Sequence, residues 1–172
     1  MDREPVLILA DIIENFMSLG NGRIFIDNQN FKMPTDTGLF VVLQQISSNN
    51  YSTTNKFIPA DEGQEGGQEL ITYRSQESYN INVMSRDSSA RQRKEEVIMA
   101  LNSDFSKNQQ EKYSFKLAKI SNSFNNISDV EGEAVLSRYV FNINLIAWYS
   151  SIRDTAYYDQ FSNQILIDNN DT

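Results

Sequence analysis

The sequence predicts one α+β domain, in which a mixed or antiparallel β-sheet is flanked by two main helices and carries a projecting β-hairpin or long loop. Three observations lead to this prediction. Apolar residues recur at helical spacing from Pro5 onward, an alternating strand at 79–85 runs directly into a second helical stretch, and alternation returns at 138–149. No internal repeat or change of composition marks a boundary, so the domain is expected to span residues 1–172.

The first helix is predicted to begin at Pro5, because proline fits the first turn of a helix, where its missing N–H costs nothing. Gly20 and Gly22 are expected to end it. An apolar face wider than half the helix predicts a core element, and docking of part of this face on a second subunit is the alternative. The residues of the face are Val6, Ile8, Leu9, Ile12, Ile13 and Phe16 or Met17.

Two strands are predicted next, a short one at 23–27 and a longer one at 39–46. The longer strand is apolar on both faces, which predicts helices on one side and a partner on the other. Leu39, Val41 and Leu43 form one face, and Phe40, Val42 and Ile46 form the other.

Residues 47–68 are rich in Ser, Asn and Gly and predict the tip of a hairpin or a loop insertion. Phe57 and Ile58 are expected to extend the preceding strand as one arm of this hairpin, and residues 69–73 are expected to form the returning strand. We expect the tip to project and to become ordered on contact with a partner. A flexible loop with no partner is the alternative.

The stretch 79–105 is the predicted nucleus of the domain. Tyr79, Ile81 and Val83 alternate with asparagines, and Ser89 with Gln92 fits a capping box before a helix that reaches Phe105. Residues 102–110 are then expected to be a loop, 113–120 a strand and 121–132 a polar connection. The strand at 138–149 is expected to be central, with its odd-numbered residues on the helices, and the apolar tail at 157–167 is expected to pack or to add a short strand.

Composition excludes several kinds of site. The chain has no Cys and no His, so disulfides, thiolate or imidazole metal sites and Cys or Ser/His catalytic sets are impossible. The acidic groups at 61–65 and 129–133 lack the spacing of a metal-binding loop, and we expect no cofactor, no metal and no enzymatic activity. The apolar run at 6–13 is too short to span a bilayer, so we expect a soluble protein without a membrane partner.

Four basic residues cluster around the second helix: Arg86, Arg91, Arg93 and Lys94. A net charge of −8 disfavours a dedicated nucleic-acid surface, since phosphate binding requires many clustered cations. Two other interpretations remain open. The cluster forms an ordinary solvated helix face, or it meets acidic loops of the next subunit in a ring.

Residues 81–101 read Ile-Asn-Val-Met-Ser-Arg-Asp-Ser-Ser-Ala-Arg-Gln-Arg-Lys-Glu-Glu-Val-Ile-Met-Ala-Leu. This strand, its Ser/Asp entry and the helix that follows resemble the core of the tail terminator (neck terminator) proteins of long-tailed, particularly contractile-tailed, bacteriophages. The strand at 139–149 followed by Tyr157 and Tyr158 is similar to the end of those proteins. The resemblance covers most of the chain, except for the insertion at 47–68.

The resemblance implies a virion protein of the tail and neck, assembled in the host cytoplasm. It implies a homo-hexameric ring on the head-proximal end of the tail tube, which stops tube and sheath polymerisation and joins a head-completion or connector protein. DNA passes through an acidic lumen without binding. A head–tail connector or tail tube-like ring protein is the alternative, and a monomeric intracellular protein-binding module is a further one.

Eight residues are candidates for the interface with a second subunit or another partner. They combine apolar strand residues with the basic residues of the second helix. They are Phe40, Val42, Phe57, Ile58, Arg86, Arg91, Arg93 and Trp148.

Overall fold

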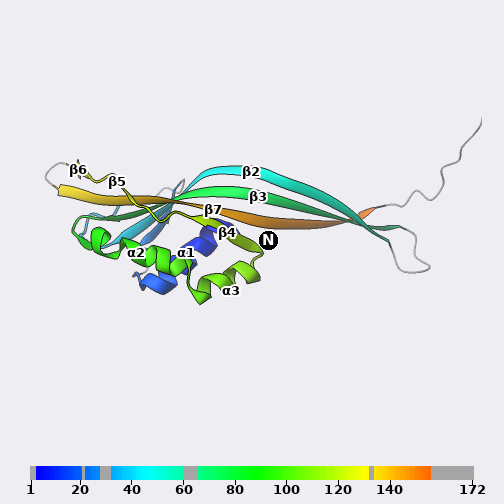
Figure 1. Cartoon of the computed structure of the whole chain (residues 1–172), viewed down its shortest axis with the longest axis horizontal. Coiled ribbons are helices and arrows are strands. Elements are labelled where there is room, and N and C mark those ends of the chain that lie inside the picture. The colour runs from blue at the N-terminus through cyan, green and yellow to red at the C-terminus, as the bar shows by residue number, and fades with distance from the viewer. Residues whose placement is uncertain (1–2, 21, 28–31, 60–65, 132–133, 156–172) are drawn as a thin grey trace, which may run out of the picture. The chain divides into compact units, whose positions relative to one another are not determined.

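The structure is a computed structural model that describes residues 3–20, 22–27, 32–59, 66–131 and 134–155. It shows an α+β protein with a mixed sheet and three helices, which confirms the predicted class (Figure 1). The chain divides into two compact units. The larger unit comprises Met1–Thr53 and Tyr73–Tyr149, and the smaller unit comprises Thr54–Thr72 and Ser150–Thr172.

The sheet has the strand order β1-β2-β3-β7-β4, and β5 and β6 also pair with β7. Strand β1 is parallel to β2, whereas β4, β5 and β6 are antiparallel to β7, so the sheet is mixed. The elements are α1 (Pro5–Met17), β1 (Ile24–Ile26), β2 (Phe40–Pro59), β3 (Gly67–Ser85), α2 (Ser89–Leu101), α3 (Asp104–Lys112), β4 (Phe115–Ile120), β5 (Asn125–Asn126), β6 (Asp129–Glu131) and β7 (Ala134–Thr155).

Side-chain pairs give the direction of the long strands in the larger unit. Between β3 and β7, Ser78 Oγ donates to Asn144 Oδ1 at 2.9 Å, and Arg138 donates to Asn82 Oδ1 at 2.8 and 3.0 Å. Positions therefore rise along β3 as they fall along β7, which is the antiparallel arrangement. β7 lies between β3 and β4 and is interior, as its alternation predicts.

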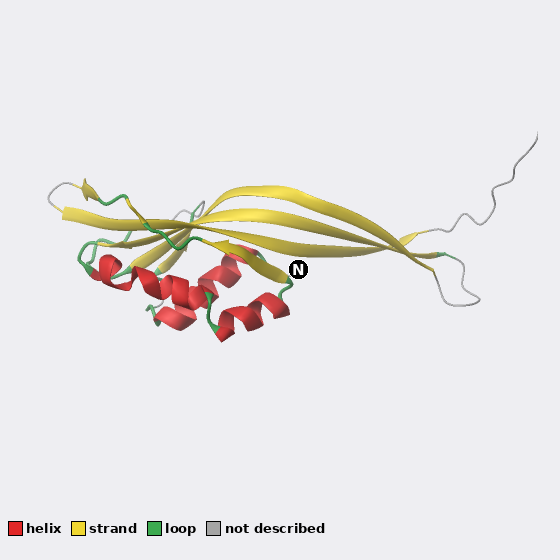
Figure 2. Ribbon diagram, viewed as in Figure 1, coloured by secondary structure: helices red, strands yellow, loops and turns green. Residues whose placement is uncertain are grey.

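All three helices of the larger unit lie on one face of the sheet (Figure 2). The main core forms between that face and the helices. Odd-numbered residues of β7 enter this core, as predicted, and so do Leu39 and, from β2, Val41 and Leu43. The residues that α1 buries are Pro5, Val6, Ile8, Leu9, Ile12, Ile13 and Met17. The core interpretation of the first helix is therefore confirmed.

The ends of the first two helices differ from the prediction. Helix α1 ends at Met17, and its C-cap is Ser18 rather than a glycine: Ser18 has a left-handed backbone (φ 49°), and its N–H donates to Glu14 O at 3.0 Å. The predicted capping box of Ser89 with Gln92 is wrong, because Ser89 is the first residue of α2. Ser85 Oγ accepts the N–H of Ala90 at 2.9 Å instead, which satisfies one of the free donors at the start of the helix.

The predicted loop at 102–110 is also wrong, because most of it forms α3, the third helix. Ser103 is its N-cap and accepts the N–H of Ser106 at 3.1 Å. Asp104 in the first turn and Lys112 in the last turn both interact favourably with the helix dipole. Phe105 belongs to α3 rather than to the second helix, where the apolar spacing placed it.

Strands β2 and β3 are longer than predicted. Residues 47–59 continue β2, and residues 67–78 belong to β3 without a break, so only the segment between Pro59 and Gly67 separates the two strands. The polar composition at 47–56 therefore belongs to a strand and not to a loop. The predicted tip at 60–65 lies outside the described residues.

In the smaller unit, side chains bridge the ends of three strands. Asn55 of β2 donates to Glu69 of β3, and Gln68 of β3 donates to Asp154 of β7 at 3.1 Å. Gly67 is needed here, because a Cβ at this position would lie 2.4 Å from the ring of Phe57. The predicted packing of the tail at 157–167 falls outside the described residues.

Candidate interaction surface

The second face of β2 is covered by the chain itself. Phe40 is fully buried and Val42 is 8% exposed, and both pack in a small cluster with Met84 and Leu136. Neither residue is available at the surface of the larger unit, which corrects their assignment to a subunit interface. Phe40 and Val42 do lie on a second buried face, which residues of β3, β7 and nearby segments cover, whereas Ile46 of the predicted face is 52% exposed.

Beside this cluster, the same face carries a row of amide side chains. Asn142 of β7 donates to Asn80 of β3, and Asn82 Nδ2 donates to Val42 O at 3.3 Å. Because these amides are hydrogen-bonded across the strands, this part of the face is polar, and Arg138 is its charged member. Arg138 joins the row through its two hydrogen bonds to Asn82.

The basic cluster of the second helix separates into individual roles. Arg93 pairs with Glu96 and also donates to Met17 O, the last residue of α1, at 2.8 Å. Lys94 pairs with Glu95, and its ammonium lies 5.5 Å from the rings of Phe124 and Tyr139. Arg93 and Lys94 therefore stabilise the fold.

The two remaining arginines of the cluster differ in exposure. Arg86 is half-buried, and its Nε donates to Pro34 O at 3.4 Å. Arg91 is exposed. Of the four basic residues, Arg91 is thus the one whose side chain the fold leaves toward solvent.

We predict that Arg93→Ala lowers the free energy of unfolding by about 1–3 kcal/mol, because Met17 O and Glu96 lose their donor. Arg91→Ala is the matched control on the same helix and is expected to change stability by less than about 0.5 kcal/mol. Urea unfolding monitored by circular dichroism measures both. Equal losses for the two variants would contradict the separate roles.

A buried carboxyl group is the main polar feature that the sequence analysis missed. Glu77 of β3 is 4% exposed and accepts hydrogen bonds from the hydroxyls of Tyr79 and Tyr149 and from Gln45 Nε2. Burial, and then the bond to Glu77, raises the pKa of Tyr79 well above its usual value. Burial and the nearby Glu77 charge likewise raise the pKa of Tyr149. The signal was the register: Glu77 lies two residues before Tyr79, on the same face of the strand.

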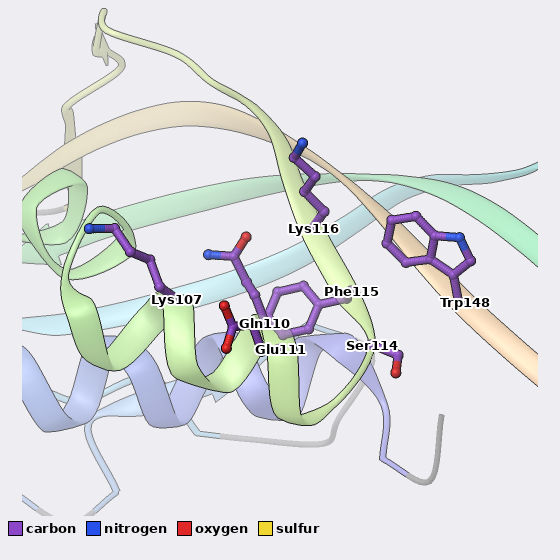
Figure 3. Close-up of a pocket in the computed structure, with 7 residues that line it drawn as sticks. All are labelled: Lys107, Gln110, Glu111, Ser114, Phe115, Lys116 and Trp148. Carbon is purple, nitrogen blue, oxygen red and sulfur yellow. The ribbon is translucent and has the colours of Figure 1, made fainter.

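A groove of about 700 Å³ lies between α3, β4 and β7 (Figure 3). Trp148, a predicted interface residue, lies on the β7 side of this groove and is half-buried. Its backbone N–H donates to Ser114 O at 3.0 Å. The other lining residues are Lys107, Gln110, Glu111, Phe115 and Lys116. The lining combines the apolar rings of Phe115 and Trp148 with polar side chains of α3 and β4.

The outer edge of β2 is open over a long stretch. Strand β1 pairs with β2 only from Val41 to Leu43, and no other strand of the described residues pairs with this side of β2. Residues 44–53 of the larger unit therefore present unpaired backbone groups along this edge. This stretch contains no charged residue and no proline.

The opposite edge of the sheet is protected along β4. The N–H of Leu117 in β4 donates to the side chain of Gln110 in α3 at 2.9 Å, so one backbone donor of this edge is already used. Lys116 and Lys119 are exposed on the same strand. Lysines on an edge strand discourage pairing with another sheet.

Phe57 and Ile58, the remaining interface candidates, belong to the smaller unit. They are 42% and 37% exposed, which leaves their side chains accessible. In the described ranges, no three acidic side chains lie close enough together to bind a metal ion. No helix in these ranges is long and apolar enough to cross a membrane.

No protein-family model matches the chain, and no curated protein matches it. The stretch that carries the sequence resemblance is residues 81–101. In the structure these residues are the last part of β3, its Ser/Asp connection and the whole of α2.

Proposed function

We propose that the protein is a structural virion protein that forms a hexameric ring, terminates a phage tail tube or sheath, and joins it to the head–neck. In this role it is not an enzyme. The observation that carries the proposal is the open, uncharged edge of β2 on a sheet whose other edge is protected along β4. A protein with one such edge is suited to joining its sheet to a neighbouring subunit.

Two further features support a ring around DNA. A contact between different surfaces of identical subunits repeats in one direction and closes into a ring when the rotation allows it. The net charge of −8 gives DNA little to bind, as a channel for DNA requires. The resemblance of residues 81–101 to tail terminator proteins supports a position of this ring on a phage tail.

We predict that electron microscopy of the purified protein, mixed with isolated tail tubes, shows rings that cap one end of each tube. A terminator is expected to stop at one ring, because its second face meets a different protein. The control is the protein without tubes, which is expected to give single rings or free subunits. Long cylinders without tubes would indicate a tube-like protein instead. Monomers that never bind tubes would contradict the proposal and favour a monomeric binding module.

A further inference from the structure

We infer that residues 44–53 of β2 form a continuous sheet with residues 150–154 of β7 from a second copy of the chain. This inference deepens the proposed function and rests on it for the closure of the contact into a ring. It names the two strand edges that join neighbouring subunits.

Within the described residues, the β1 side of β2 is unpaired from residue 44 to residue 53. In an extended strand every second residue directs its N–H and C=O toward a given edge, so ten residues present roughly ten polar groups there. Pairing with β1 ends at Leu43, where Asp27 N–H donates to Leu43 O at 2.7 Å. A strand added to this edge would satisfy these groups in the geometry that they already have.

The usual protection of an edge strand is missing along residues 44–53 of β2 and present along β4. Native edges carry lysine, proline or a covering side chain. Strand β4 has Lys116, Lys119 and the Gln110 hydrogen bond, whereas residues 44–53 have no charge and no proline. Large apolar side chains are also exposed here, since Ile46 is 52% and Tyr51 60% exposed. An added sheet would cover part of both.

The end of β7 is the strand of the second copy that fits this edge. Trp148 N–H donates to Ser114 O, and past this point no strand within the described ranges pairs with that side of β7. Residues 150–152 are uncharged, and Ile152 is 58% exposed. A contact of β2 with β2 would be two-fold and would stop at a dimer, whereas a contact of β2 with β7 repeats from copy to copy.

The chain has no cysteine, so introduced thiols are the only ones present. We would make Asn49→Cys, Asn50→Cys and Ser151→Cys, and combine each β2 change with Ser151→Cys. Asn49 and Asn50 are exposed neighbours that point to opposite faces, so one of them shares a face with position 151. A short bismaleimide reagent joins thiols across the contact and tolerates a small offset in register.

One double variant is expected to give a ladder of cross-linked species up to the hexamer on a denaturing gel. An equal mixture of the matching single variants is expected to give a dimer and nothing larger. Each single variant alone is expected to stay monomeric on the gel. Asn108→Cys with Ser151→Cys places a thiol on the exposed surface of α3 and is the matched control without a ladder.

Three outcomes overturn the inference. A dimer from Asn49→Cys or Asn50→Cys alone would show β2 paired with β2. Absence of cross-linking in both double variants, in samples where microscopy shows rings, would place the contact elsewhere and leave the proposed function intact. A ladder equally strong in the α3 control would mean random collision. A specific ladder from protein that does not cap tubes would support the inference and contradict the terminator function.

Discussion

Replacing Glu77 by alanine is expected to lower the free energy of unfolding by about 3–5 kcal/mol, because three hydrogen-bond donors lose one shared acceptor. The hydroxyl of Tyr79 is buried and the hydroxyl of Tyr149 is partly buried, so water replaces the lost bonds poorly. The Gln45 amide loses its bond to the same carboxyl group. The cavity left by the shorter side chain adds to the loss.

Urea unfolding of Glu77→Ala and the wild type, with circular dichroism as the signal, measures this effect. Glu77→Gln is the matched control, because it keeps the side-chain size and one carbonyl acceptor. Its loss is expected to be about 1–2 kcal/mol. An alanine variant within about 1 kcal/mol of the wild type would contradict a shared acceptor in the core.

Raising the pH above about 10 is expected to destabilise the protein steeply, since tyrosine ionises near pH 10 in the unfolded chain. In the folded protein the pKa of Tyr79 and the pKa of Tyr149 are raised, so both groups keep their protons to higher pH. The unfolded state then binds fewer protons than the folded state, and stability falls as pH rises. This stability contribution is complete below pH 10. Above it, each tyrosine contributes a loss of up to about 1.4 kcal/mol per pH unit.

Urea unfolding at a series of pH values between 9 and 12 gives the slope of stability against pH. Tyr79→Phe removes one of the two groups and is expected to reduce the slope above about pH 10 by up to about 1.4 kcal/mol per unit. Tyr51→Phe replaces an exposed tyrosine of β2 and is the matched control for the loss of one hydroxyl. A wild-type slope near zero up to pH 12 would contradict the shifted pKa values of the buried pair.

The elements predicted well are those whose apolar residues meet the core at a regular period. Helix α1 and the odd-numbered face of β7 both follow this rule, as does the passage from β3 into α2. In each case burial of one face is the main stabilising term, so the pattern of apolar residues carries the information. The third helix, α3, does not follow this rule.

Helix α3 was missed because Phe105 is its only large apolar residue. Its stability comes from Ser103 at the N-cap and from charges at the ends, which leave no periodic pattern. The second half of β2 was missed for a related reason. One of its edges is unpaired and its side chains are mostly exposed, so no core imposes alternation on residues 47–59.

The candidate interface was predicted less well than the fold. Phe40 and Val42 are apolar because the chain covers them, and Arg93 is basic because it binds Glu96 and the end of α1. A single sequence contains the same residue types for a subunit contact and for a second internal cluster. Glu77 shows the reverse case, in which a charged residue type conceals a core position.

The open edge of β2 also affects how the free protein behaves at high concentration. Unpaired backbone groups do not distinguish the correct strand from any other extended chain, including nascent or misfolded copies. Long-range repulsion between acidic molecules opposes such encounters, and it weakens as ions shorten the screening distance to about 8 Å at physiological salt. Higher ionic strength is therefore expected to favour the proposed strand pairing and non-specific aggregation alike.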